Sequence, residues 1–236
     1  MNVLGIDTAT AASAACVLRE DGAVFEVEPP AARLGERPAH AAELMPAVVR
    51  CMDESGVGWD DLDAIAVGVG PGMFTGLRIG VATAHGLAAA TGVELRPVSS
   101  LAALAARPEG DGARSNGAVA SSGGATLAVI DARRDEVFAA LHGGDGEFWE
   151  PFVAAPEAVA ERVRERGTAT LAVGDGAVRF RDVLEAAGAR VPEDGSSSHV
   201  VRGLSICRLA ATVAPAPVEA VLPDYLRLPD AKPRIQ

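Results

Sequence analysis

Short apolar stretches separated by polar turns open the chain and predict a three-stranded antiparallel meander. Strands are expected at residues 3–6, 14–18 and 24–27, because each run is apolar or alternates and is bounded by polar or small residues. The dipeptide Asp21-Gly22, between the second and third runs, is typical of a tight hairpin turn. The sequence therefore begins with strands that pair locally.

The same pattern returns in the second half of the chain. Strands are expected at residues 127–130 and 137–141, followed by a turn at Asp145-Gly146 and a third strand. After each meander come a helical pattern, a short buried strand that ends in Gly-x-Gly, and a second helical pattern. These segments are residues 40–55, 64–70 and 75–90 in the first half, and residues 156–166, 171–176 and 179–187 in the second.

The unit β-β-β-α-β-α thus occurs twice, which is typical of a duplicated α/β fold. It resembles the ASKHA fold of actin, Hsp70 and sugar kinases. We expect residues 1–106 to form the first half, residues 126–236 the second, and the Gly- and Ser-rich residues 107–125 a flexible linker. A C-terminal helix is expected at about residues 200–214, and it could pack back on the first half.

The glycine-rich segment before and within the helix at 75–90 carries a small residue at every fourth position. These positions are Gly72, Gly76, Gly80, Ala84 and Ala88. Residues four apart share one face of a helix, and glycine within a helix costs roughly 0.5–1 kcal/mol relative to alanine. The stripe therefore needs a packing reason. Two remain open: close packing against the protein's own sheet or first helix, or an interface with another chain.

The first helix, at residues 40–55, also has a broad apolar face, and Pro46 is expected to kink or restart it. The two helices could pair with each other or form half of an intermolecular bundle. For the intermolecular case the expected contact residues are His40, Leu44, Val48, Gly72, Gly76, Leu77, Gly80, Val81 and Ala84. Gly80→Leu or Ala84→Arg would then abolish pairing and leave the fold intact.

The turn after the first strand of each half is where proteins of the ASKHA fold usually hold nucleotide phosphates and metal. Here the first turn supplies hydroxyls but no glycine or lysine, and the second supplies arginine. Candidate phosphate contacts are Asp7, Thr8, Thr10, Asp131 and Arg133. The alternative is that Asp7 and Asp131 are hydrogen-bonded turn residues. The glycine-rich segment itself matches neither the Walker A motif nor the dinucleotide fingerprint.

Composition and charge exclude further classes of function and location. The net charge of −11 argues against tight nucleic-acid binding by the chain alone. Three widely spaced cysteines, Cys16, Cys51 and Cys207, suit buried reduced thiols. The absence of a signal-like N-terminus and of any 18-residue apolar run leads us to expect a cytoplasmic protein without a membrane span.

Catalytic motifs are weak throughout the chain. The four histidines are scattered, and Leu44 occupies the position at which a metal-binding His-x-x-x-His pair would have its second histidine. No Gly-x-Ser-x-Gly nucleophile motif occurs. We therefore expect no metal site and no catalytic residues, with His40 as a helix-start or core-edge residue.

Several segments together resemble one family, TsaB (also called YeaZ). They are "GIDTAT", "HAAELMP", "GVGPGMFTGLRIGVATAHGLA", "IDARRDEVFAA", "GDGA" and "PDYLRLP", which are spread over nearly the whole chain. The most specific is the stretch from Gly70 to Gly80. Met73 departs from the serine usual in that family, and Phe138 from a frequent tyrosine.

The resemblance implies a non-catalytic protein of ASKHA fold that acts in the synthesis of tRNA threonylcarbamoyladenosine (t6A). Its implied partners are TsaD, the paralogue that transfers the threonylcarbamoyl group, and the ATPase TsaE. It would bind tRNA only through that complex, form a homodimer when alone, and have no cofactor of its own, with ATP or ADP possible at the interface with TsaD. The alternative is an enzyme that acts alone, either an ATP-dependent kinase of this fold or a peptidase-like hydrolase.

Overall fold

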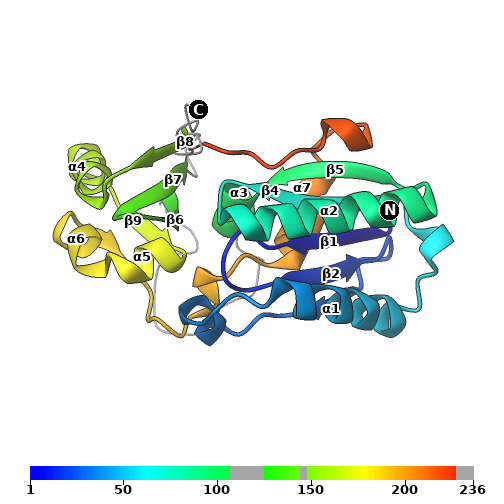
Figure 1. Ribbon diagram of the computed structural model, residues 1–236. Helices are drawn as coiled ribbons and strands as arrows, with labels where there is room; N and C mark the ends of the chain where they lie inside the picture. The colour runs from blue at the N-terminus through cyan, green and yellow to red at the C-terminus, as the bar shows by residue number, and fades with distance from the viewer. Residues whose placement is uncertain (107–124, 144–147, 227–236) are drawn as a thin grey trace, which may run out of the picture.

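Two five-stranded sheets of the same topology build the molecule (Figure 1). The computed structural model describes residues 1–106, 125–143 and 148–226 of the 236-residue chain. The strand orders are β3-β2-β1-β4-β5 and, read in the matching direction, β8-β7-β6-β9-β10. Each sheet combines an antiparallel meander with two parallel strands, so the predicted duplication of an α/β unit is confirmed.

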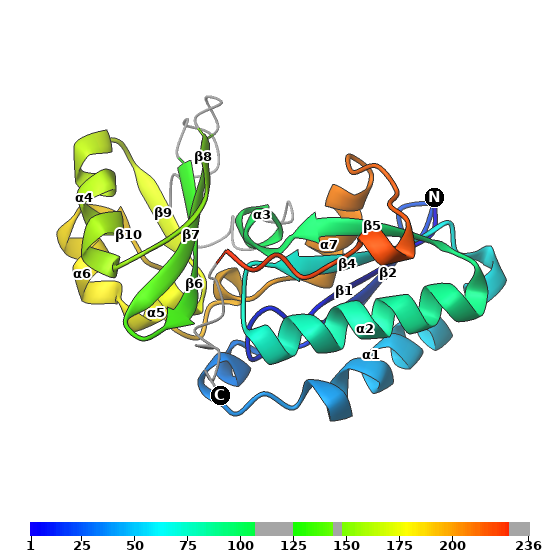
Figure 2. The same cartoon turned by 45° about the horizontal axis from the view of Figure 1, so that its top comes forward.

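The first sheet is covered by helices on both faces (Figure 2). Alternate residues of its strands point to opposite faces, so Leu4 and Ile6 pack beneath α1 and α2, whereas Val3 and Cys16 pack beneath α3 and α7. Its strands are β1 (Val3–Asp7), β2 (Ala14–Leu18), β3 (Val24–Val27), β4 (Ala64–Gly70) and β5 (Glu94–Ser99). Its helices are α1 (His40–Ser55), α2 (Phe74–Thr91), α3 (Ser100–Ala105) and α7 (Gly203–Ala210).

The second sheet has a smaller helical layer on its outer face. An apolar cluster joins its strands to α4 and α6, with Val159 and Leu184 fully buried. Its strands are β6 (Ala125–Arg133), β7 (Glu136–Gly143), β8 (Phe148–Ala154), β9 (Thr170–Val173) and β10 (Ala189–Arg190). Its helices are α4 (Pro156–Arg166), α5 (Asp175–Arg179) and α6 (Arg181–Ala186). Short 3-10 turns occur at Ala31–Gly35, Trp59–Asp61, Ser197–His199 and Val218–Ala220. In the described part of the chain, no helix has both the length and the apolar character that crossing a bilayer requires.

Sequence and structure differ at the ends of each unit. The predictions missed the edge strands β5 and β10; β5 contains Pro97, which an edge position tolerates. The helix expected at 179–187 is instead two short helices, because Phe180 leaves helical geometry between α5 and α6. The C-terminal helix is shorter than expected. The linker predicted at 107–125 lies outside the described residues except for Ala125, and so does the Asp145-Gly146 turn.

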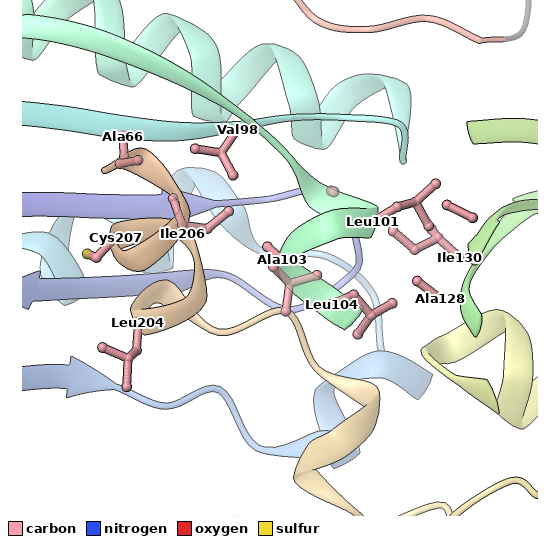
Figure 3. Packing of buried hydrophobic residues seen from close by; sticks show 14 of the residues in the cluster. Ala66, Val98, Leu101, Ala103, Leu104, Ala128, Ile130, Leu204, Ile206 and Cys207 are labelled. Atoms are coloured by element: carbon pink, nitrogen blue, oxygen red, sulfur yellow. The ribbon is translucent and has the colours of Figure 1, made fainter. Parts of the chain in front are cut away.

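Helix α3 links the two halves within one apolar cluster that also includes residues of α7 (Figure 3). Leu101 and Leu104 of α3 lie in the same cluster as Ile130 of β6. Helix α7 packs on β1 and β2, where Gly5 and Gly203 let its backbone approach the sheet closely. The last helix of the chain thus belongs to the core of the first sheet.

A buried ion pair holds the start of α7 against β3. Glu26 of β3 accepts hydrogen bonds from the Arg202 guanidinium, at 2.5 and 3.1 Å, and from the backbone N–H of Leu204 at 3.1 Å. The Glu26 and Arg202 side chains are only 5% and 13% exposed. The carboxylate therefore satisfies a free N–H at the helix N-terminus, where negative charge is favourable.

The small-residue stripe of α2 faces inward, onto the turn that follows β1. A Cβ added at Gly76 would clash with the carbonyl oxygen of Thr8, and one added at Gly80 would clash with its hydroxyl. The Thr8 hydroxyl donates a hydrogen bond of 2.7 Å to the Gly76 carbonyl. The intramolecular packing reason for these glycines is thus present in the fold. Gly86, on the opposite side of α2, faces open space.

Alanine substitutions at Gly80 and Gly86 should therefore change stability in opposite directions. Gly86→Ala is expected to stabilise the chain by roughly 0.5–1 kcal/mol, because it adds helix propensity without a clash. Gly80→Ala should destabilise it by about 1–3 kcal/mol, because the new methyl group overlaps Thr8. Urea denaturation of the two variants and wild type measures both differences, and a stable Gly80→Ala protein would contradict the inward packing.

Candidate functional site

The turn after β1 is closed by hydrogen bonds from within the chain. Asp7 is buried; its Oδ1 accepts the backbone N–H of Ala9 at 2.8 Å, and its Oδ2 accepts the hydroxyl of Ser100 at 2.6 Å. Ser100 Oγ in turn accepts the N–H of Gly70 at 3.2 Å. The carboxylate therefore ties β1 to the start of α3 and to the end of β4.

Burial raises the pKa of Asp7 to about 6, although the bonds from Ser100 and Ala9 oppose this shift. The neighbouring hydroxyls are also engaged, since Thr8 bonds α2 and Thr10 Oγ1 accepts the N–H of Ala12 at 3.4 Å. The side chains of Asp7, Thr8 and Thr10 therefore each have a hydrogen-bond partner within the chain and do not need a ligand.

The equivalent turn after β6 is closed by arginines. Arg179 of α5 donates to both oxygens of Asp131, at 3.0 and 2.9 Å, and Arg133 donates to Asp131 Oδ2 at 3.2 Å. The Asp131 side chain is only 7% exposed. Nearby, Asp175 accepts the N–H of Asp131, and burial raises the pKa of Asp175 to about 6. The carboxylate that would face a phosphate-bound cation is paired inside the chain.

His40 sits at the start of α1 and is buried. Its Nδ1 lies 2.8 Å from the hydroxyl of Ser13, while its Nε2 is buried without a hydrogen-bond partner, beside Gly76. Burial lowers the pKa of His40. Leu44, one turn further along, is buried in the apolar core. Within the described ranges, no group of three or more His, Cys, Asp or Glu could hold a metal ion.

The residues predicted to contact a partner are mostly inside the molecule, and this corrects the sequence-based assignment of the surface. Gly72 is half-buried. The others are buried against the chain's own sheet: His40, Leu44, Val48, Gly76, Leu77, Gly80, Val81 and Ala84. Gly80→Leu or Ala84→Arg would therefore disturb the fold, contrary to the expectation that it stays intact.

The outward sides of the same two helices carry a different set of residues. On α1, Met45 and Val49 are 38% and 44% exposed and lie one helical turn apart. On α2, the exposed residues Ala82, Gly86 and Ala90 repeat every four positions. We call these five residues the α1–α2 face. A partner helix could approach this face closely, because its α2 side presents almost no side chain. The i, i+4 spacing was visible in the sequence, but the inward stripe has the same spacing.

The pH dependence of stability should reveal the buried charge of Asp7. Its folded-state pKa of about 6 exceeds the ordinary value of 3.8, so protonation stabilises the fold; this contribution is complete below 3.8 and lost as the pH rises through about 6. Relative to Asp7→Asn, wild type should therefore gain on the order of 1 kcal/mol between about pH 7 and pH 5. Urea denaturation of both proteins at the two pH values checks this, and an unchanged difference would contradict the assignment.

Comparison with known proteins identifies the family. A family model described as TsaD, tRNA N6-adenosine threonylcarbamoyltransferase, matches residues 36–169. The chain is 34% identical over 241 residues to the tRNA threonylcarbamoyladenosine biosynthesis protein TsaB of Escherichia coli, covering 96% of this chain and 95% of that protein. It is also 34% identical over 243 residues to an uncharacterized protein of Mycobacterium leprae, with 98% of this chain matched; the chain spans 56% of that relative.

Solved structures agree with the sequence relatives. YeaZ from Pseudomonas aeruginosa superposes with a TM-score of 0.73 and 31% sequence identity, over 95% of this chain and 99% of that one. This similarity confirms the predicted ASKHA-like fold. With matches above 30% identity along nearly its whole length, the chain belongs to the TsaB/YeaZ family.

Proposed function

We propose that the chain is a non-catalytic assembly partner of a TsaD-like threonylcarbamoyltransferase and acts in the formation of t6A in tRNA. The observation that carries the proposal is the α1–α2 face, where Met45 and Val49 of α1 expose apolar side chains and the contacting helix α2 exposes the small residues Ala82, Gly86 and Ala90. Gly86 is unfavourable in a helix, and a Cβ added there would meet no atom of the described residues within 4 Å, so close approach of a second chain gives this glycine a physical reason.

Sequence similarity between this chain and TsaD proteins supports the choice of a TsaD-like partner. The TsaD family model, which matches residues 36–169, covers α1, α2 and the strands from β4 to β8. A tRNA N6-adenosine threonylcarbamoyltransferase of Cereibacter sphaeroides is 40% identical over 122 residues, or 46% of this chain. Chains of one fold can pair about a pseudo-two-fold axis, with the same face used on both sides. A paralogue is therefore suited to cover the α1–α2 face.

The hydrogen-bonded carboxylates in the turns after β1 and β6 support a role without catalysis by this chain. Asp7 and Asp131 are both buried and hydrogen-bonded to groups of the same chain, so a nucleotide would have to break these contacts to bind as in a kinase. In the proposed complex a TsaE-like ATPase joins the pair, tRNA binds through the assembly, and ATP or ADP binds at the interface of the two paralogues. Alone, the chain would form a homodimer through the same face, in the cytoplasm.

The second candidate is an enzyme that acts alone. It is favoured by two buried carboxylates, Asp7 in the first turn and Asp175 at the start of α5, because their raised pKa values near 6 are a property common at catalytic sites. A solved structure from Pseudomonas aeruginosa is also described as similar to peptidase YEAZ. Calorimetric titration of the isolated chain with Mg-ATP and a peptidase assay test this alternative. ATP binding at micromolar concentrations, or peptide hydrolysis lost on Asp7→Asn, would favour the enzyme.

Substitutions on the α1–α2 face should abolish the complex without unfolding the chain. Val49→Asp and Gly86→Leu each place a charge or bulk where a partner helix would lie, and each should weaken binding by roughly a hundredfold or more. Phe148→Asp is the control, because Phe148 is 48% exposed on β8 of the other sheet. Light scattering and titration against the purified TsaD-like protein measure the effect.

Circular dichroism confirms that each variant folds. Wild type should convert from a homodimer to a one-to-one heterodimer when the TsaD-like protein is added, and Phe148→Asp should do the same. Wild-type affinity in both face variants would overturn the surface assignment. No complex with the wild-type chain would overturn the proposed function itself.

A further inference from the structure

The C-terminal strap, residues 216–226, runs along the side of α2 that is turned away from α1. In both views α2 lies between α1 and this strap (Figures 1 and 2). The backbone N–H of Ala216 donates to Leu95 O at 2.9 Å, and that of Asp224 donates to Val69 O at 2.7 Å. His85 of α2 donates from Nε2 to the carbonyl of Val221 at 2.8 Å. The strap is thus hydrogen-bonded to β4, β5 and α2.

The strap ends in a solvent-facing aromatic cluster at the start of α2. The guanidinium carbon of Arg78 lies 3.9 Å from the centre of the Phe74 ring, and the Phe74 and Tyr225 rings are 5.2 Å apart. Arg78 Nε donates to the hydroxyl of Tyr225 at 3.0 Å. These contacts hold the exposed side chains of Phe74 and Arg78 against the half-buried Tyr225.

The exposure of apolar side chains in this region, at Phe74 and at Leu222 of the strap, does not stabilise the fold. Phe74 is 46% and Leu222 of the strap is 63% exposed, although apolar side chains gain stability only when they leave water. The large exposed apolar side chains of the described chain are Met1, Val24, Met45, Val49, Phe74, Phe148 and Leu222. Four of these seven lie on α1, α2 or the strap. A concentration of exposed apolar side chains on neighbouring elements is typical of an interaction surface.

We infer that the surface for the TsaD-like partner extends across α2 onto the strap, with Phe74, Arg78, Leu222 and Tyr225 as an anchor on the far side of α2. The inference rests on the proposed function. In this arrangement the low surface at Ala82 and Gly86 lies between Met45 and Val49 on one flank and the anchor on the other. A helix of the partner would then be held by large apolar side chains on both sides.

The chemistry of the anchor fits a protein partner. Tyrosine and arginine are frequent among the residues that dominate protein interfaces, and side chains held in place before binding lose less entropy on association. The Arg78–Tyr225 hydrogen bond supplies that order. An RNA partner is disfavoured by the exposed Asp224 and Glu219 of the strap and by the net charge of −11, because phosphates would be repelled.

The test compares two phenylalanines of similar exposure on different parts of the surface, Phe74 on α2 and Phe148 on β8. Phe74→Ala should weaken binding of the purified TsaD-like protein by roughly tenfold or more in a calorimetric titration, whereas Phe148→Ala should change it by less than about twofold. Tyr225→Phe keeps the ring but removes the acceptor of Arg78, and should weaken binding by roughly threefold to tenfold. Circular dichroism and thermal unfolding verify that all three variants fold like wild type.

The outcomes separate this inference from the proposed function. If Val49→Asp abolishes binding but Phe74→Ala behaves like Phe148→Ala, the anchor is wrong and the proposed function stands. If the wild-type chain does not bind the TsaD-like protein, both are wrong. Should Phe74→Ala leave protein affinity unchanged but reduce binding of an anticodon stem-loop RNA to the assembled complex, the surface belongs to RNA and the inference is overturned.

Discussion

The close approach of the first turn to α2 governs the rest of this structure. Thr8 occupies the space that side chains would take at Gly76 and Gly80, and its hydroxyl is bonded to the helix backbone. A turn fixed in this way has no open room between itself and the helix for a phosphate group. The same contact therefore holds α2 firmly against the first turn, and it fixes the position of the residues that α2 exposes.

The rigid frame continues on the other side of the first sheet. Helix α3 joins the apolar cluster of that sheet to the second sheet, and α7 packs on the first sheet and on α3. Glu26 with Arg202 fixes the start of α7. Hinge closure around a nucleotide requires two halves that can move with few shared contacts. Here a common core that includes Leu101, Leu104 and Ile130 joins the two halves.

Local pattern predicted what depends on local physics. Alternation and turn residues located the strands of both meanders, and the apolar face of α1 fixed its bounds at His40–Ser55. The direction of the glycine stripe could not be predicted, because small residues at every fourth position favour close packing equally with a neighbouring turn or with another chain. The Arg78–Tyr225 bond joins residues 147 positions apart, and no spacing rule predicts such a pair. The sequence also does not predict β5, which contains Pro97, since proline argues against a strand unless the strand is known to lie at the edge of a sheet.

Two buried polar groups near the first turn, Asp7 and His40, are engaged by residues of the same chain. Asp7 remains ionised at neutral pH at an energetic disadvantage, because its folded-state pKa is near 6. Its value to the fold is that one carboxylate bonds both Ala9 and Ser100 and thereby fixes β1 relative to α3. Near the same turn, Leu44 takes the place of a second histidine and leaves His40 packed as a neutral ring. A carboxylate and a histidine that could serve chemistry thus hold backbone elements together, and the exposed apolar side chains gather on α1, α2 and the strap. Both observations agree with the proposed role as an assembly partner, since a surface that meets a partner needs a fixed scaffold beneath it.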